Sequence, residues 1–201
     1  MAAFTAFPNN ADAEKGFKTI GENINGSGIS PSGQYYIGTS VNDYINGINM
    51  KSFLYDTKDG TLTWITEADK NDYTKCGRFN AVSDNGIICG DAINTDIQLE
   101  SGIQPVSAAI WENGKRTLLE YGDFDISTMT GQSDGSFSQD ISEDGSVVVG
   151  NFSTSNGAYY TPCKWVKNSE GKYAIEFLTV PENMKNGYAK KCLHLTEEFS
   201  A

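Results

Sequence analysis

The stretch that decides the fold reads Asp140-Ile141-Ser142-Glu143-Asp144-Gly145-Ser146-Val147-Val148-Val149-Gly150. Close copies occur earlier, as Ala81-Val82-Ser83-Asp84-Asn85-Gly86-Ile87-Ile88-Cys89-Gly90 and Gly28-Ile29-Ser30-Pro31-Ser32-Gly33-Gln34-Tyr35-Tyr36-Ile37-Gly38. Each copy holds a strand end, a polar turn that contains Gly, and a second short strand that stops at a Gly, which is typical of a β-hairpin. We therefore predict hairpin turns with positive φ at Gly33, Gly86 and Gly145.

A second motif follows every copy and predicts two more strands. It reads Ser52-Phe53-Leu54-Tyr55, Ala108-Ala109-Ile110-Trp111 and Pro162-Cys163-Lys164-Trp165, each followed closely by a polar residue and Gly. The turn serines Ser30, Ser83 and Ser142 recur at intervals of about 55 residues, a spacing in the range of propeller blades. The predicted fold class is therefore all-β, a β-propeller-like array of four-stranded antiparallel units.

The repeats cover most of the chain, which we interpret as a single domain over 1–201. They lie at roughly 25–65, 78–120 and 137–178. A further strand is predicted at 16–20, and the tail 179–201 lacks the hairpin motif. Three interpretations stay open: the two termini form an irregular fourth unit, the chain is a fragment of a longer propeller, or copies of it associate.

Connections of two lengths alternate along the repeats. The first-to-second and third-to-fourth connections are tight turns, whereas the second-to-third and inter-unit connections are long. In a four-stranded meander the long ones all leave from one end, which we call the long-loop face. It comprises 39–51, 66–77, 92–106, 121–137 and 151–161.

Composition restricts the partners. Lys and Arg number 15 against 26 Asp and Glu, a net charge of −11, and no basic cluster interrupts this excess. Nucleic acid is therefore excluded as a partner, and a neutral or basic one is favoured. No apolar run approaches the roughly 20 residues that span a membrane. Residues 1–8 lack the basic start and long apolar segment of an export signal, so we expect none in this chain.

Several apolar positions recur at equivalent places and predict the core. We expect burial of Val82, Ile88, Cys89, Ile110, Trp111, Ile141, Val147, Val149 and Trp165. The two tryptophans are interpreted as packing between neighbouring units, and Trp64 as exposed. Cys89 and Cys163 replace apolar residues of other repeats, which predicts free buried thiols. No C-x-x-C spacing occurs, so no metal or other cofactor is predicted.

No catalytic constellation is recognisable. The chain has one histidine, His194, and a Ser-His-acid triad would depend on it. Carboxylates in the long connections leave a glycan-acting hydrolase as a minor hypothesis. They are Glu67, Asp69, Asp72, Asp123, Asp125 and Asp134. The stretch Asp56–Gly60 is better interpreted as a turn than as a calcium loop.

Aromatic residues of the long connections are not needed for repeat packing. They are Tyr44, Tyr73, Tyr121, Phe124, Tyr159 and Tyr160. Aromatic and acidic side chains on loops over a rigid scaffold are typical of a recognition surface. The residues predicted to contact a ligand are Tyr44, Asp72, Tyr159 and Tyr160.

Taken together, the motifs resemble the bacterial β-propeller-type repeats of the HAF-like class, whose units read I-S-x-D-G-x-x-V-x-G and then A-x-x-W-x-x-G. The resemblance covers Gly28 to Leu178, and the first repeat departs from it at Pro31-Ser32 and Tyr55. It implies a secreted or cell-surface location and a binding or accessory role. We therefore expect a non-catalytic module that binds a protein or glycan through the long-loop face. The alternatives are a scaffold domain of a larger protein and, third, the hydrolase.

Overall fold

The computed structural model describes residues 4–6, 17–20, 24–40, 51–65, 78–131 and 133–179, and these form an all-β structure, as predicted. Beside the strands, the described residues include a short 3-10 turn, η1 (Ile126–Thr128). The strands are β1 (Phe4–Ala6), β2 (Phe17–Thr19), β3 (Ile24–Ile29), β4 (Tyr35–Ser40), β5 (Ser52–Asp56), β6 (Thr61–Ile65), β7 (Arg78–Val82), β8 (Ile88–Ile93), β9 (Val106–Glu112), β10 (Lys115–Leu118), β11 (Gly135–Ile141), β12 (Val147–Thr154), β13 (Tyr159–Lys167) and β14 (Tyr173–Phe177).

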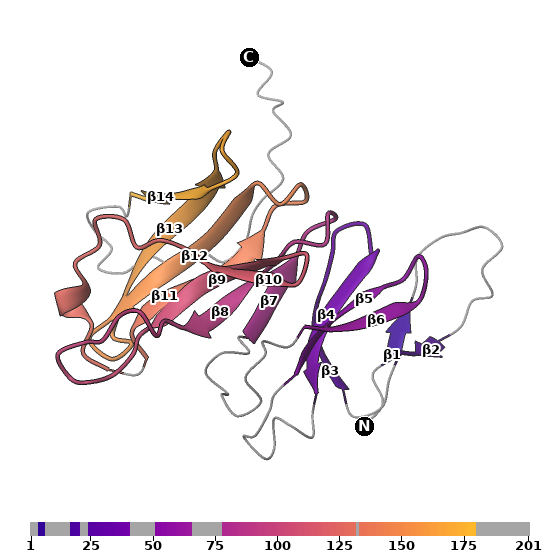
Figure 1. Ribbon diagram of the computed structural model, residues 1–201, viewed down its shortest axis with the longest axis horizontal. Helices are drawn as coiled ribbons and strands as arrows, with labels where there is room; N and C mark the ends of the chain where they lie inside the picture. Colours follow the sequence, from indigo (N-terminus) through magenta and orange to yellow (C-terminus); the bar gives the residue numbers. More distant parts are fainter. Residues whose placement is uncertain are drawn as a thin grey trace.

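The strands from β3 onward pair as successive antiparallel meanders (Figure 1). Unit 1 comprises β3 to β6, unit 2 comprises β7 to β10, and unit 3 comprises β11 to β14. Within the described residues, the strand ladders of units 2 and 3 share one parallel pair, Gly135 with Val106. The predicted strand at 16–20 is β2, and it pairs with β1 in a separate two-stranded sheet. The tail 180–201 lies outside the described residues, and its part in an irregular fourth unit stays one of the three open interpretations.

The repeated serine and glycine build the same turn in each unit. Gly33, Gly86 and Gly145 have φ of 76°, 73° and 72°, as predicted. In each turn the Gly N–H donates to the carbonyl of the serine, and the serine hydroxyl accepts from an N–H at or just before the start of the next strand. The hydroxyl bonds join Ser30 to Tyr35, Ser83 to Ile87 and Ser142 to Val147, at 3.2, 3.0 and 2.9 Å. The serine recurs because it closes the turn.

The second glycine of the motif has a different role from the one predicted. The second strand of each unit does not stop there: β8 continues past Gly90, and β12 continues past Gly150. Opposite each of these glycines the first strand of the unit contains a β-bulge. A Cβ at Gly90 would lie 2.0 Å from the Arg78 carbonyl oxygen, and one at Gly150 would lie 2.1 Å from that of Phe137. Only glycine therefore permits this close approach.

The core lies between the units. Of the predicted buried residues all but Val147 are buried. Val147 is half-buried, whereas its equivalent Ile87 packs in the cluster shared with unit 3. Among the described elements, no further unit covers the corresponding side of unit 3, which explains the difference.

The tryptophans pack between units, as predicted. Trp111 is 1% exposed and clusters with Ile37 and Ile65 of unit 1. Trp165 is fully buried, and its Nε1 donates to the carbonyl of Glu120 in unit 2 at 2.9 Å. Trp64 is 40% exposed, also as predicted. Cys89 and Cys163 are buried free thiols, which confirms their assignment to the core.

Candidate functional site

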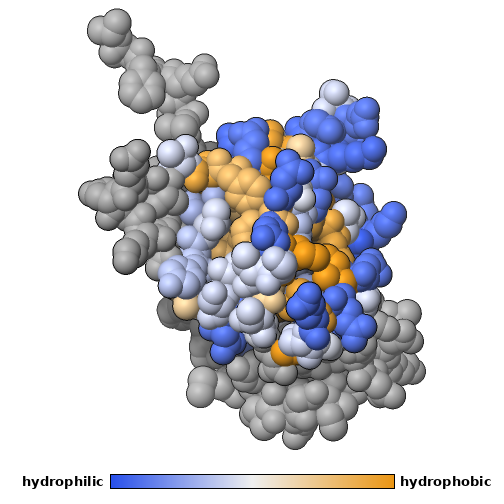
Figure 2. Space-filling model, turned by 90° about the vertical axis from the view of Figure 1, so that its left-hand side faces the viewer, coloured by the Kyte–Doolittle hydropathy of each residue, from blue (hydrophilic) through white to orange (hydrophobic). Residues whose placement is uncertain are grey.

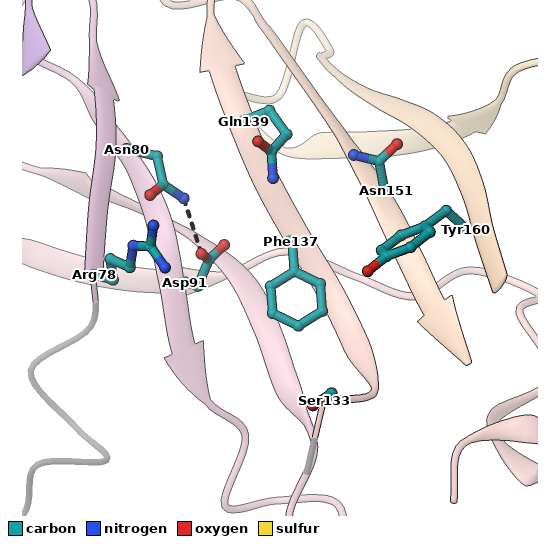
Figure 3. A pocket seen from close by; sticks show the side chains of 8 residues that line it. All are labelled: Arg78, Asn80, Asp91, Ser133, Phe137, Gln139, Asn151 and Tyr160. Carbon is teal, nitrogen blue, oxygen red and sulfur yellow. Dashed lines mark hydrogen bonds between the residues drawn. The ribbon is translucent and has the colours of Figure 1, made fainter. Parts of the chain in front are cut away.

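A cavity of about 430 Å³ opens between units 2 and 3. It lies where β7 and β8 approach β11, β12 and β13, as Figure 3 shows. Arg78 begins β7 and Ser133 shortly precedes β11, so the cavity reaches the end of the molecule at which the inter-unit connections enter. Its lining residues are Arg78, Asn80, Asp91, Ser133, Phe137, Gln139, Asn151 and Tyr160.

Two of the lining side chains are placed by the bulges. In β7, Phe79 pairs with Gly90 and Ala81 with Cys89, which leaves Asn80 as the extra residue. In β11, Ser138 pairs with Gly150 and Asp140 with Val149, which leaves Gln139 as the extra residue. A bulge bends its strand and redirects side chains. Asn80 and Gln139 thus reach the cavity from equivalent positions of neighbouring units.

Asp91 joins the two units at the wall of the cavity. Its Oδ1 accepts from the backbone N–H of Ser138 at 2.9 Å, and its Oδ2 accepts from Nδ2 of Asn80 at 2.9 Å. Asn80 Nδ2 also donates to the Ser138 carbonyl at 2.7 Å, and the Ser138 hydroxyl donates to the Gly90 carbonyl at 2.8 Å. This network fixes the walls of the cavity relative to each other.

Burial dominates the electrostatics of Asp91. It raises the pKa of Asp91 to about 7, although the hydrogen bonds from Asn80 and Ser138 and the charge of Arg78 act in the opposite direction. The described lining residues therefore include one guanidinium and one carboxyl group that titrates near neutral pH. When Asp91 is ionised these two charges balance, and such a lining suits an uncharged polar ligand.

Two aromatic rings, Phe137 and Tyr160, complete the lining (Figure 3). Tyr160 is one of the residues predicted to contact a ligand, and that role stays a prediction. Its neighbour Tyr159, also predicted, is 53% exposed, and successive strand residues point to opposite faces. Tyr159 is not among the lining residues. The other two predicted contacts, Tyr44 and Asp72, lie outside the described residues.

The predicted long connection at 151–161 is wrong. β12 and β13 stay paired as far as Thr154 with Tyr159, so only a four-residue turn separates them. Ser155, Asn156 and Gly157 of this turn have positive φ. Tyr159 and Tyr160 therefore lie on a strand, which the polar sequence of the segment did not indicate.

Two other aromatic residues predicted for the recognition surface instead pack internally. Tyr121 is 8% exposed, and its hydroxyl donates to the Val106 carbonyl at 2.6 Å. Phe124 stacks on Phe152 with ring centroids 4.2 Å apart, and Phe177 packs on both rings. Phe177 is 42% exposed. Figure 2 shows apolar surface among hydrophilic residues on the side of the molecule where η1 and β14 lie. Tyr73 lies outside the described residues.

The described loop carboxylates, Asp123, Asp125 and Asp134, do not line the cavity. Asp123 and Asp125 are exposed, and Asp125 accepts from the N–H and hydroxyl of Ser127. Asp134 is fully buried and accepts backbone N–H bonds. Glu67 and Asp69 lie outside the described residues. Within the described part of the chain, no group of three or more His, Cys, Asp or Glu side chains could hold a metal ion.

Sequence reasoning missed Asn80, Asp91 and Gln139. The available signal was a polar residue at the same place in successive repeats, three positions before the turn serine for Asn80 and Gln139 and directly after the strand glycine for Asp91 and Asn151. Polar residues in a strand with one solvated face are common, and the bulge that redirects Asn80 and Gln139 is not visible in the sequence.

No family model matches the chain, and no curated protein matches it. Among solved structures, the chain is similar to that of a putative TolB from Agrobacterium tumefaciens, with a TM-score of 0.45 and 14% sequence identity. The match covers 80% of this chain and 51% of the other, so this chain spans about half the length of that protein. The described residues contain no helix with the length and apolarity to cross a membrane.

Proposed function

We propose that the chain is a non-catalytic binding module of β-propeller-like architecture, which holds part of a glycan in the cavity between units 2 and 3. The observation that carries the proposal is the composition of this cavity. Its walls combine the amides of Asn80, Gln139 and Asn151 with the rings of Phe137 and Tyr160. Amides donate to and accept from hydroxyl groups, and an aromatic face packs against the apolar side of a sugar ring.

The charge of the molecule supports a neutral ligand over an acidic one. The chain carries a net charge of −11, which repels anions at low salt. In the cavity the guanidinium of Arg78 is balanced by Asp91 when that carboxyl group is ionised. A neutral glycan needs no compensating charge. The expected extracytoplasmic location rests on the family resemblance and agrees with a glycan ligand.

Hydrogen exchange with and without a bound glycan tests the proposal. A glycan array first identifies a ligand, and the protected segments are then mapped. We expect protection at the ends of β7, β11 and β13 that surround the cavity, and loss of binding in Tyr160→Ala. Tyr159→Ala is the matched control, because Tyr159 is not in the cavity lining. Protection restricted to the tight turns 83–86, 113–115 and 143–145 would contradict the proposal.

A scaffold role within a larger assembly is the second candidate, and the tight turns favour it. The Asp84 carboxylate accepts from the N–H and hydroxyl of Ser32, and the Asp84 N–H donates to the Glu143 carbonyl. Each turn is thereby fixed to the turn of the next unit. Light scattering across a concentration series distinguishes the candidates, because a scaffold that assembles with itself gains mass without any glycan.

The hydrolase hypothesis has less support from the cavity. The described lining residues include one carboxyl group, that of Asp91, whereas glycoside hydrolysis uses two.

A further inference from the structure

We infer that Asn80 and Gln139, the bulge residues of units 2 and 3, determine which glycan the cavity accepts, by reading the hydroxyl groups of a neutral sugar. This inference rests on the proposed function and extends it to specificity. The inference is based on a β-bulge that recurs in the backbone of each unit. The first strand of each unit contains a bulge at the equivalent position, where the extra residue is Ser27, Asn80 or Gln139. A bulge redirects the side chain of its extra residue, and in units 2 and 3 this side chain lines the cavity.

The orientation of the Asn80 amide is fixed by its neighbours. Nδ2 donates one hydrogen to the Asp91 carboxylate and one to the Ser138 carbonyl, at 2.9 and 2.7 Å. An amide nitrogen has two hydrogens, so both donors are used. When Asp91 is ionised, a flipped amide would place its oxygen against two acceptors. The Oδ1 atom of Asn80 is therefore left to accept, and it selects a ligand group that donates, such as a sugar hydroxyl.

Gln139 complements Asn80 because its amide is uncommitted. Among the described residues its side chain makes no hydrogen bond, and it is half-buried in the cavity wall (Figure 3). It can therefore donate to one hydroxyl and accept from another at once, which suits neighbouring hydroxyls on a sugar ring. A fixed acceptor beside an adaptable donor and acceptor discriminates between sugars by the positions of their hydroxyls.

Asp91 acts in this arrangement as a positioning residue. It contacts Asn80 through Oδ2 and holds the amide so that the oxygen remains free for the ligand. In Asp91→Asn one of the two acceptors can become a donor, and the orientation of Asn80 is then no longer fixed. Asp91→Asn should therefore broaden the range of sugars that bind, whereas loss of a purely structural group would weaken binding of all sugars equally.

The test measures binding of a panel of methyl glycosides of neutral, amino and carboxylated hexoses by calorimetry. For the wild type we expect the tightest binding with a neutral glycoside. Gln139→Ala should weaken that binding about tenfold, the scale of one to two hydrogen bonds, with an unchanged thermal midpoint because Gln139 has no hydrogen bond to lose. Gln139→Glu, which removes the donors, should shift the preference toward amino sugars. Ser27→Ala, at the equivalent bulge of unit 1 outside the cavity, is the matched control.

The outcomes separate this inference from the proposed function. If both Gln139 variants keep the affinity and ranking of the wild type while Tyr160→Ala loses binding, the cavity binds glycans but the bulge residues do not select them. The inference is then wrong and the proposed function stands. If the wild type binds no glycan of the array or the panel, the proposed function is wrong and the inference falls with it.

Discussion

The carboxylate of Asp91 accepts a hydrogen bond of 2.9 Å from the backbone N–H of Ser138, so a side chain of unit 2 satisfies the main chain of unit 3. The donor residue, Ser138, directly precedes the bulge residue Gln139, where the ladder between β11 and β12 is interrupted. A bulge leaves main-chain groups without their usual partners. Asp91 supplies one of these partners at the wall of the cavity, which couples the structure of the candidate site to the contact between the units.

We predict that Asp91 makes stability depend on pH in the neutral range. Burial raises its pKa to about 7 in the folded protein, against about 3.9 in an unfolded chain. Between these two pH values the folded state binds the proton more tightly than the unfolded state does. The stability that Asp91 contributes through this proton is therefore fully present below about pH 4 and is lost as the pH rises through 7. The wild type should therefore lose stability relative to Asp91→Asn as the pH rises from 5 to 8. In other words, the free energy of unfolding of the wild type minus that of the variant should decrease. Chemical denaturation at each pH measures it.

The exposed Asp123 provides the control for this titration. Asp123→Asn removes one exposed carboxylate and therefore controls for the change in net charge. A pH-independent difference between the wild type and Asp91→Asn would show that Asp91 is ionised throughout and that its burial is compensated.

Trp111→Ala should destabilise the fold by about 3–5 kcal/mol, the usual scale for emptying a buried aromatic site. Trp111 is 1% exposed and packs edge to face on Phe79 with centroids 4.8 Å apart. Denaturant midpoints measure the loss. Trp64→Ala, at a position 40% exposed, should cost much less. A loss below about 1 kcal/mol for Trp111 would show that the site is not core.

Gly150→Ala should also destabilise, by about 1–3 kcal/mol, because overpacking forces the backbone to move. The added Cβ would lie 2.1 Å from the Phe137 carbonyl oxygen and 2.9 Å from the Trp165 ring. Gly26→Ala in β3 is the matched control, since nothing lies within 4 Å of a Cβ there. Equal thermal midpoints for the two variants would mean that the bulge does not require glycine.

The hairpins could be predicted from the sequence because their determinants are local. Ser83 and Gly86 act within one turn, and their spacing alone indicates the hydrogen bonds that close it. The bulges could not, because they depend on the pairing of two strands. Asn80 reads as an ordinary strand residue until Gly90 is placed opposite the bulge. The sequence pattern predicts a loop at Tyr160, yet this residue reaches the cavity from a strand. The site therefore depends on register, which a single sequence specifies weakly.

The last prediction concerns Asp134, which fastens the connection before β11 to the turn between β12 and β13. Its Oδ2 accepts from the N–H groups of Thr130, Gly131 and Asn156 at 2.6, 2.9 and 2.9 Å, and its Oδ1 accepts from Gly157 at 3.0 Å. Burial opposes ionisation, but these N–H groups outweigh it and lower the pKa of Asp134. The carboxylate is fully buried.

Asp134→Asn should therefore destabilise the protein at pH 7 by about 1–3 kcal/mol, because the amide turns a donor toward buried N–H groups that lose their acceptor. A lowered pKa contributes stability above the unfolded value, near 3.9, and this contribution is lost as the pH falls through the folded value. The difference in the free energy of unfolding between the wild type and Asp134→Asn should thus be constant from pH 8 to pH 5 and should shrink at lower pH. Asp123→Asn, which removes an exposed carboxylate of the same connection, controls for loss of charge. A difference that grows on acidification would show that Asp134 is not held as the carboxylate, since a protonated side chain cannot accept all four bonds.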